Sequence, residues 1–175
     1  MVLSFFYGCS KSLYLSSNGK DHLAISPPLV IFETRKNISD ELLKIHETEQ
    51  SKIFQKEMHA YVLKMKSKKK DNLKIQDPEK TNVILKSNDI NSSNISIKDT
   101  CGILKVDGVL FSKFSVFNPM PIDNDVIATL SLKDCSSGSI VWKYEKKYSW
   151  NIFSTPTSLV ELLMSDARKK MPYFD

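Results

Sequence analysis

Glycine, proline and cysteine are all scarce in this chain of 175 residues, which contains 5, 7 and 3 of them respectively. Five glycines leave little material for a glycine-rich loop that cradles a nucleotide. Three cysteines with no CxxC spacing supply neither a disulfide framework nor a zinc cluster. No apolar run approaches the roughly 18 residues that a membrane-spanning helix requires. With 41% hydrophobic and 26% charged residues, the chain has the composition of one ordinary globular domain.

Sequence signatures of catalysis are missing as well. The chain has no HExxH, GxSxG, P-loop or dinucleotide-binding motif, each of which needs particular residues at a fixed spacing. His46 and His59 are 13 residues apart, so on a helix they point to different faces, and His22 has no ligand-type neighbour. We therefore expect neither an enzyme nor a metal or other cofactor. One alternative stays open, a small cysteine or histidine hydrolase that would bring Cys101, His59 and Asp107 together.

The net charge of +5 rests on lysine, because only Arg35 and Arg168 among the 25 basic residues are arginine. Arginine recognises phosphates and base edges through paired hydrogen bonds, whereas lysine is a flexible, solvated point charge. The lysine excess therefore indicates an ordinary solvated surface rather than a surface that binds nucleic acid. The densest run lies at the end of an expected helix, where positive charge complements the helix dipole. Its members, which are also the candidate contacts for an anionic lipid surface or for nucleic acid, are Lys64, Lys66, Lys68, Lys69 and Lys70.

Residues 1–9 read MVLSFFYGC, a short apolar run that ends in a small residue directly before Cys9. This pattern resembles the end of a truncated bacterial lipoprotein signal, the lipobox, with a true start upstream of Met1. The resemblance implies cleavage before Cys9 and attachment of lipid to it. The alternative is that residues 1–9 form an ordinary apolar strand or tail. Residues 10–21 are polar and serine-rich, which is typical of a flexible tether, and we expect residues 22–175 to form a single α/β domain.

Apolar periodicity and breakers predict the first elements of that domain. Residues 22–34 favour a strand, which Pro27 and Pro28 interrupt because proline cannot donate a ladder hydrogen bond. Ser39 caps a long helix that ends in the lysine run near Lys70. His46, Glu49 and Gln50 interrupt the apolar stripe of this helix, so its first turns are expected to project beyond the core. The apolar positions that recur at helical spacing are Leu42, Ile45, Ile53, Met58, Tyr61, Val62 and Met65.

The rest of the chain predicts a strand over 72–76, helices over 78–87 and 95–105, strands over 106–117, 126–133 and 139–148, and a helix over 155–171. The strand over 106–117 is expected to contain a bulge. The last helix is expected to turn inward Leu159, Leu162, Leu163, Ala167 and Met171. The order β-α-β-α-α-β-β-β-α predicts an α/β (α+β) fold with a mixed sheet of about five strands and helices packed on it. Its first strands are parallel, since helices connect them, and its last three are antiparallel.

Two segments carry a family resemblance, LKVDGVLF at 104–111 and ATLSLKDCSSGSIVWK at 128–143. They resemble envelope lipoproteins of the group that includes the TolB N-terminal domain, the curli-secretion lipoprotein CsgG and the penicillin-binding-protein activator LpoB. That group has a strand reading Leu-x-Asp-x-x-x-Gly-x-x-x-Trp, which Leu132, Asp134, Gly138 and Trp142 match in order. Across 22–174, including the opening Ser26-Pro27-Pro28, the chain is also similar to uncharacterised lipoproteins of the Bacteroidetes type.

The matched residues have expected structural roles. Gly138 permits a turn conformation, Trp142 supplies a large apolar face for the core, and Asp107 caps or braces a corner between a helix and a strand. Ligand contact by these residues is the alternative. Cys101 and Cys135 could pair if the chain is exported, and the sequence leaves that pairing open.

The resemblance implies a non-catalytic cell-envelope lipoprotein whose domain binds another envelope protein in an assembly or accessory role. It touches the membrane through the lipid anchor only, at the outer membrane and facing the periplasm, since Ser10-Lys11-Ser12 after the anchor carries no acidic sorting signal. Association with further copies of itself is left open. The first alternative is a soluble basic module that binds nucleic acid, and the second is the hydrolase named above.

Overall fold

The strand β4 is the centre of a six-stranded mixed sheet in the computed structural model, which describes residues 22–33, 39–69, 73–90, 97–117, 124–150 and 155–171. The strands are β1 (His22–Ile25), β2 (Leu29–Phe32), β3 (Lys74–Ile75), β4 (Gly108–Phe117), β5 (Asn124–Asp134) and β6 (Ile140–Trp150). The helices are α1 (Asp40–Lys69), α2 (Pro78–Lys86), α3 (Ile97–Leu104) and α4 (Pro156–Ala167), which continues into a 3-10 turn over Arg168–Lys170.

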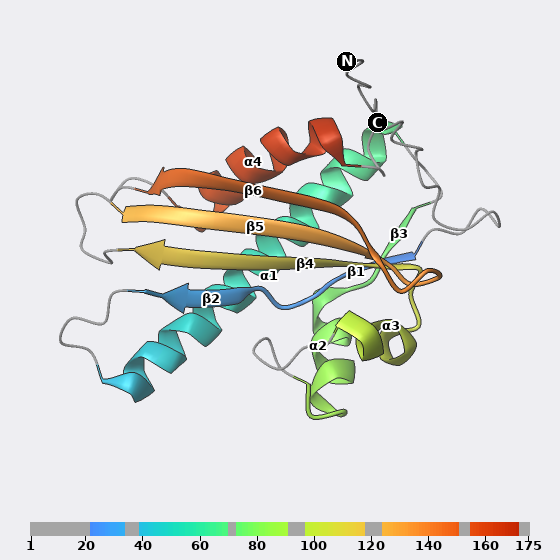
Figure 1. Ribbon diagram of the computed structural model, residues 1–175, viewed down its shortest axis with the longest axis horizontal. Coiled ribbons are helices and arrows are strands. Elements are labelled where there is room, and N and C mark those ends of the chain that lie inside the picture. The colour runs from blue at the N-terminus through green and yellow to red at the C-terminus, as the bar shows by residue number, and fades with distance from the viewer. Residues whose placement is uncertain are drawn as a thin grey trace, which may run out of the picture.

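The sheet runs in the order β3-β1-β4-β5-β6, and β2 also pairs with β4 (Figure 1). The pairs formed by β1 with β3 and β4, and by β2 with β4, are parallel, while β5 is antiparallel to both β4 and β6. This arrangement confirms the predicted mixed sheet with helices packed against it. It contains one strand more than the rounded prediction because the first strand is split in two.

The split falls at the two prolines. β1 pairs with Gly108–Leu110 and β2 with Lys113–Val116, so together they form one interrupted strand along β4. Proline lacks the N–H that a continuous ladder would need. Helix α1 satisfies the carbonyl groups at the break: the Ser51 hydroxyl donates to the Pro28 carbonyl (2.6 Å) and the Gln55 amide donates to the Ile25 carbonyl (2.8 Å).

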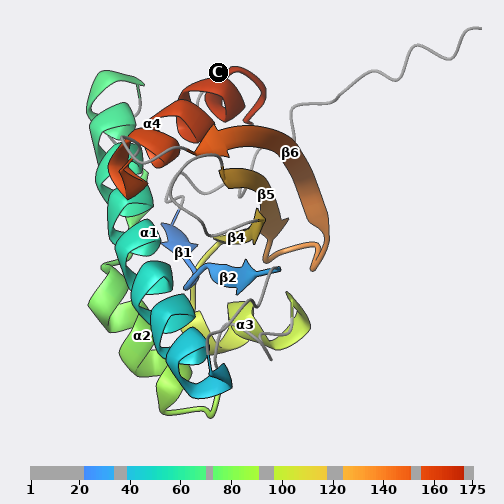
Figure 2. The same ribbon diagram turned by 90° about the vertical axis from the view of Figure 1, so that its left-hand side faces the viewer.

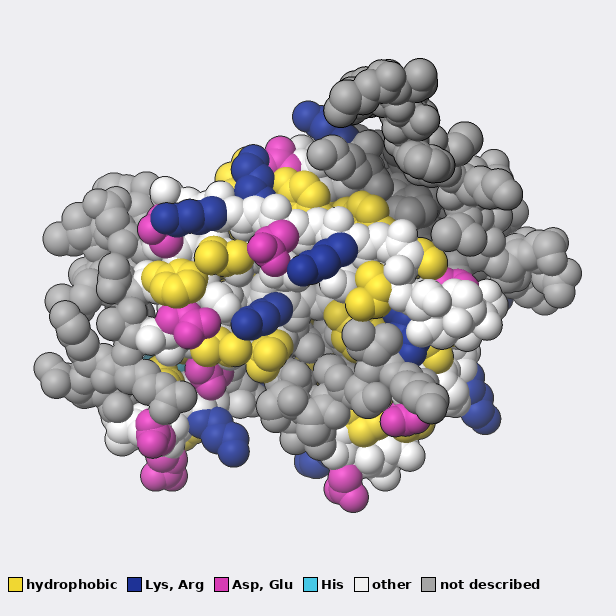
Figure 3. Space-filling model, in the orientation of Figure 1, with side chains coloured by type: hydrophobic (Ala, Val, Ile, Leu, Met, Phe, Trp, Pro, Cys, Tyr) yellow, Lys and Arg dark blue, Asp and Glu magenta, His cyan; other side chains and the backbone are white. Residues whose placement is uncertain are grey.

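The helices cover the two faces of the sheet unequally (Figures 1 and 2). α1 and α4 pack together over one face and enclose the larger core, where the rings of Phe54 and Phe114 stack with centroids 4.2 Å apart. α2 and α3 cover the other face only near β1, above a smaller cluster that includes Ala24 and Val109. The rest of that outer face carries lysine and acidic side chains among hydrophobic ones (Figure 3).

Capping residues fix where helices α2 and α4 begin. The Asp77 carboxylate accepts hydrogen bonds from the backbone of Glu79 and Lys80 at the start of α2, where Pro78 occupies the first turn. Thr155 and Ser158 form a reciprocal capping box at the start of α4. Of the helices that the structure describes, even the 30-residue α1 is not apolar enough to cross a membrane.

Two details of the predicted packing are wrong. Along α1, Met58, Val62 and Met65 are buried as expected, and Leu42 and Ile45 in the first turns are 55% and 48% exposed, as the interruption of the stripe predicts. Ile53, which was expected in the same stripe as the buried residues, is instead 40% exposed. The expected inward Leu162 of α4 is 51% exposed, whereas its neighbour Leu163 is buried.

The expected bulge in β4 is also absent, since its register with β5 runs unbroken from Gly108 to Phe117. The register shift lies instead between β5 and β6, at Leu132 and Lys133. β4 presents side chains to cores on both faces: Phe114 and Val116 belong to the larger core, while Phe111 packs against the smaller cluster. Burial on both faces, rather than a bulge, is the reason that this strand does not alternate cleanly between apolar and polar residues.

Candidate interaction site at the disulfide-linked corner

A disulfide joins Cys101 of α3 to Cys135 in the turn after β5, with the two Cα atoms 5.4 Å apart. The pairing that the sequence left open is thus formed. It also overturns the alternative nucleophile set of Cys101, His59 and Asp107, because a sulfur atom held in a disulfide supplies no thiolate for attack. The bond joins two parts of the chain, the end of α3 and the β5–β6 turn. Together with the starts of β1 and β4, which hydrogen bonds connect to the turn, we call this region the corner.

Asp107 ties three of these parts together. Its side-chain Oδ2 accepts a hydrogen bond from the backbone N–H of His22 (2.7 Å), and its own N–H donates to the His22 carbonyl (2.8 Å). Its carbonyl accepts from the N–H of Cys135 (2.9 Å). Lys105, with a positive φ of 53°, turns the chain out of α3 just before it. In the described structure Asp107 therefore fixes β1 and the β5–β6 turn to the start of β4.

The β5–β6 turn is organised by Asp134. Its Oδ2 accepts hydrogen bonds from the Ser136 hydroxyl (2.7 Å) and from the Ser137 N–H (2.8 Å). Burial on its own would raise the pKa of Asp134, but these hydrogen bonds from Ser137 and Ser136 outweigh it and lower the pKa. Gly138 closes the turn with a φ of +69°, in the left-handed region that glycine occupies without strain. The carboxylate is thus charged at neutral pH and committed to shaping its own turn.

Lys133 lies beside this turn and was not singled out by the sequence analysis. Its side chain is almost completely buried although it carries an ammonium group. Burial lowers the pKa of Lys133, and the carboxylate of Asp99 on α3 opposes that shift. The attraction to Asp99 offsets part of the cost of burying the charge, so it favours the position of α3 over the corner.

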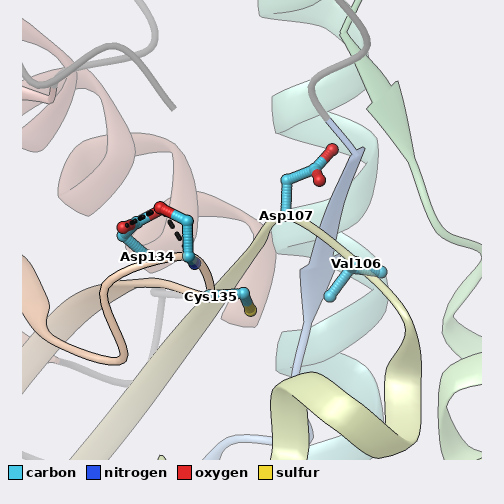
Figure 4. A pocket seen from close by; sticks show the side chains of 5 residues that line it. Val106, Asp107, Asp134 and Cys135 are labelled. Atoms are coloured by element: carbon cyan, nitrogen blue, oxygen red, sulfur yellow. Dashed lines mark hydrogen bonds between the residues drawn. The ribbon is translucent and has the colours of Figure 1, made fainter. Parts of the chain in front are cut away.

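The corner holds a shallow depression of about 220 Å³, lined by Val106, Asp107, Asp134, Cys135 and Ser136. Figure 4 shows that its two carboxylates do not converge: Asp107 points towards β1, while Asp134 is engaged by its own turn. No group of three or more potential metal ligands gathers within the described residues. What the corner offers chemically is a rigid, polar surface braced by a covalent bond.

The histidines are spread over separate elements. His22 lies in β1, and His46 and His59 lie in α1. Burial lowers the pKa of His22, opposed by Asp107, and it also lowers the pKa of His59, opposed by Asp77. His59 is therefore paired electrostatically with the cap of α2 rather than with the corner.

Trp142 lies away from the corner, on the side of β6 that faces α4. It is half-buried, packs against the larger core and stacks on Tyr144 with ring centroids 6.2 Å apart. Further along the strand, Lys146 pairs with Asp166 of α4 (2.6 Å), and Asp166 also accepts from the Tyr148 hydroxyl (3.3 Å). Burial first, and then Tyr144 and Asp166, raise the pKa of Tyr148. These contacts hold α4 against the edge of the sheet.

The remaining candidate residues lie elsewhere. Pro27 and Pro28 lie between β1 and β2, where they interrupt the strand that runs along β4. Lys64 is exposed near the end of α1. The side chains of Lys66, Lys68 and Lys69 lie outside the described part of the structure, as do Lys70 and Cys9 altogether. The structure thus brings Asp107 and Gly138 to the corner and leaves the other candidates dispersed.

The composition Cys135-Ser136-Ser137-Gly138 predicts the turn between the last two strands, but the sequence analysis missed that these serines bind Asp134. The signal was present in Asp-Cys-Ser-Ser-Gly, because an aspartate followed by serines and a glycine is a favourable turn composition. The disulfide between Cys101 and Cys135 could not be predicted from local composition. Cys101 and Cys135 are 34 residues apart, and only the fold shows that their elements meet.

Comparison with known proteins finds solved structures with a similar fold, but no match by sequence. No protein-family model matches the chain, and no curated protein matches it. The crystal structure of lipoprotein GNA1162 from Neisseria meningitidis is similar at a TM-score of 0.52 and 14% identity, over 86% of this chain and 96% of that chain. Two further solved structures are the PelC dodecamer from Paraburkholderia phytofirmans (TM-score 0.46, 14% identity, 89% of each chain) and the LpoB C-terminal domain from Salmonella enterica (TM-score 0.43, 11% identity, 73% of this chain and 82% of that one).

The chain therefore shares its fold with a solved lipoprotein at low sequence identity. The expected kinship with TolB, CsgG and Bacteroidetes proteins stays a prediction. Fold likeness at this distance does not assign an activity.

Proposed function

We propose that this protein is a non-catalytic accessory protein of the bacterial cell envelope, anchored by lipid on Cys9 and folded in an oxidising compartment. The observation that carries the proposal is the disulfide between Cys101 and Cys135. Disulfides persist in secreted and periplasmic proteins and are rare in the cytosol, where thiols are kept reduced. The bond uses two of the three cysteines and leaves Cys9, the one that follows the lipobox-like segment.

The fold of the domain supports the same compartment. Its neighbour GNA1162 is itself described as a lipoprotein. A single acyl chain binds a membrane only marginally, at about 0.8 kcal/mol for each buried CH₂ group, but the several chains of a bacterial lipoprotein hold firmly. Residues 10–21 would then tether the domain to the outer membrane on its periplasmic side.

Two surfaces of the domain suit an interaction with another envelope protein. The corner is rigid and polar, and the outer face of β4, β5 and β6 mixes lysine and acidic side chains with hydrophobic ones (Figure 3). An interface needs an apolar centre and a polar rim of this kind more than it needs a deep pocket. The proposed role is thus recognition of a second envelope protein, in its assembly or regulation.

The test is mass spectrometry of the full-length protein, expressed from its native upstream region in its own host. The expected species begins at Cys9, carries a diacyl- or triacyl-sized addition there, and yields a Cys101–Cys135 disulfide-linked peptide when it is digested without reductant. A Cys9→Ser variant is the matched control, and it should lose the lipid but keep the disulfide.

An unmodified chain that still begins at Met1 contradicts the lipid anchor. Free thiols on Cys101 and Cys135 in the same sample contradict the oxidising compartment. Together these results would favour the alternative of a soluble basic module that binds nucleic acid. Binding at the lysine run would then fall steeply between low and physiological salt concentration.

A further inference from the structure

Helix α1 carries a second apolar row on the side that faces away from the sheet. Its other side packs against β2 and α4 (Figure 2). Four large apolar side chains of the outer row are strongly exposed: Leu42 (55%), Ile45 (48%), Ile53 (40%) and Leu63 (41%). Ala60 is exposed between the last two. These positions recur close to whole turns of a 3.6-residue helix, so they form one continuous stripe.

The apolar positions of the outer stripe are placed nearly symmetrically along the helix, although only the two leucines match in identity. Leu42 and Leu63 are equidistant from the midpoint between Lys52 and Ile53, and so are Ile45 and Ala60. The stripe thus has a leucine near each end and an isoleucine at its centre. A pattern of this kind fits an isologous interface, in which a twofold axis places the same surface of two identical chains face to face.

The two charges that interrupt the stripe fit the same axis. Glu49 and Lys56 are both exposed and lie at equal distances on either side of the midpoint. None of the ion pairs recorded among the described residues includes either of them. In an antiparallel pair of α1 helices, Glu49 of each copy lies opposite Lys56 of the other. The same symmetry that pairs the apolar ends therefore pairs opposite charges twice.

We propose that the outer stripe of α1 binds a second copy of this chain, as an antiparallel helix pair about a twofold axis near Ile53. The contact extends over the 22 residues from Leu42 to Leu63, which is about 30 Å of helix. A parallel arrangement is disfavoured, because it would set Glu49 against Glu49 and Lys56 against Lys56. A helix of unrelated sequence could cover the apolar residues, but a second copy of this chain also supplies the charge pattern in reverse. The inference goes beyond the proposed function and does not depend on the lipid anchor.

The first test uses the full chain with Cys9→Ser, so that neither lipid nor a free thiol contributes to association. Sedimentation equilibrium from about 1 μM to about 200 μM should show a reversible dimer. Glu49→Lys and Lys56→Glu should each raise the dimer dissociation constant about tenfold or more, because each converts two attractive pairs into two repulsive ones. Lys113→Glu, on the outer face of the sheet, makes the same charge change as Lys56→Glu and should leave the dissociation constant unchanged.

Mixing the two single variants gives the decisive result. A heterodimer of the Glu49→Lys and Lys56→Glu chains restores both attractive pairs, so the mixture should dimerise as tightly as the parent chain. A misfolded variant could not be rescued in this way. A chain that stays monomeric over the whole concentration range overturns the proposal, and so does a dimer that both single variants leave unaltered.

The register is checked by zero-length carbodiimide cross-linking of a mixture of unlabelled and nitrogen-isotope-labelled chains. The expected product joins a Glu49 peptide of one isotope to a Lys56 peptide of the other. Intermolecular cross-links found only outside α1 would contradict the antiparallel pair.

Discussion

Gly138 shows how much a single backbone angle matters in the β5–β6 turn. Its φ of +69° lies in the left-handed region, which costs a residue with a side chain about 1 to 2 kcal/mol. The space around it would accept a Cβ atom, since no heavy atom outside the two adjoining residues lies within 4 Å of that position. The need for glycine here is therefore conformational and not steric.

Gly138→Ala is expected to lower the free energy of unfolding by about 1 kcal/mol, measured by urea denaturation. Gly102→Ala is the matched control, because its Cβ would also meet open space but the residue lies inside α3. Alanine at Gly102 should raise the free energy of unfolding by about 0.5 to 1 kcal/mol, as helix propensity predicts. Equal effects at the two positions would contradict the assignment of Gly138 to a turn that needs a positive φ.

At the residue scale the sequence predicts the structural role of a residue better than the atoms to which it is hydrogen-bonded. Composition alone indicates that Gly138 serves a turn and that Asp107 stands at a corner. The atoms that Asp107 binds belong to His22 and Cys135, which are distant in sequence. Such contacts depend on strand order, which a local pattern does not contain.

At the element scale, α4 contains two adjacent leucines with opposite surroundings. Leu163 is completely buried in the larger core, whereas Leu162 is 51% exposed. Successive residues of a helix point about 100° apart, so the pair cannot share one face. The buried stripe that decides between them consists of Leu159, Val160, Leu163, Met164 and Ala167.

Leu163→Ala is expected to cost about 2 to 5 kcal/mol of unfolding free energy, because it removes buried methyl groups and leaves a cavity. Leu162→Ala makes the same chemical change one residue away and should cost less than about 0.5 kcal/mol. Urea denaturation of both variants beside the parent chain measures the difference. A large loss at Leu162 in the monomer would show that the burial of α4 is assigned to the wrong face.

Helix α1 carries two apolar rows, and the stripe predicted from the sequence combines residues of both. It has an apolar row on the core side, through Phe54 and Met58, and another on the outer side, through Leu42 and Ile45. Periodicity finds apolar residues at helical spacing but cannot say which of two rows faces the sheet. If the outer row binds a second copy, as proposed above, both rows are buried in the dimer and the double pattern has a physical cause.

At the scale of the whole molecule, the fold class could be predicted because connection lengths constrain strand direction. Helices between the first strands force parallel pairs, and the short turn after β5 forces an antiparallel one. The division of the first strand also followed, since Pro27 and Pro28 cannot donate to a ladder. The joining of α3 to the β5–β6 turn did not follow, because it depends on which face of the sheet α3 covers.

That covalent link makes the stability of the whole domain depend on its compartment. The disulfide closes a loop with a sequence separation of 34 residues, and a bond across a loop of that size contributes about 2 to 4 kcal/mol. For a chain of 175 residues this corresponds to a fall in melting temperature of about 5 to 15 °C on reduction. The same chain should thus be markedly less stable in the cytosol than after export.

The Cys9→Ser chain with both other cysteines oxidised should melt higher, by that amount, than the same chain in excess dithiothreitol, when both are followed by circular dichroism. Cys101→Ala combined with Cys135→Ala should melt as the reduced chain does and should not respond to dithiothreitol, which separates the loss of the bond from other effects of the reductant. Because α3 packs against few other elements, its amide hydrogens should exchange faster in the reduced chain, while those of α1 and β4 change little. Equal melting temperatures with and without the bond would mean that packing alone holds the corner, and the predicted dependence of stability on the compartment would be wrong.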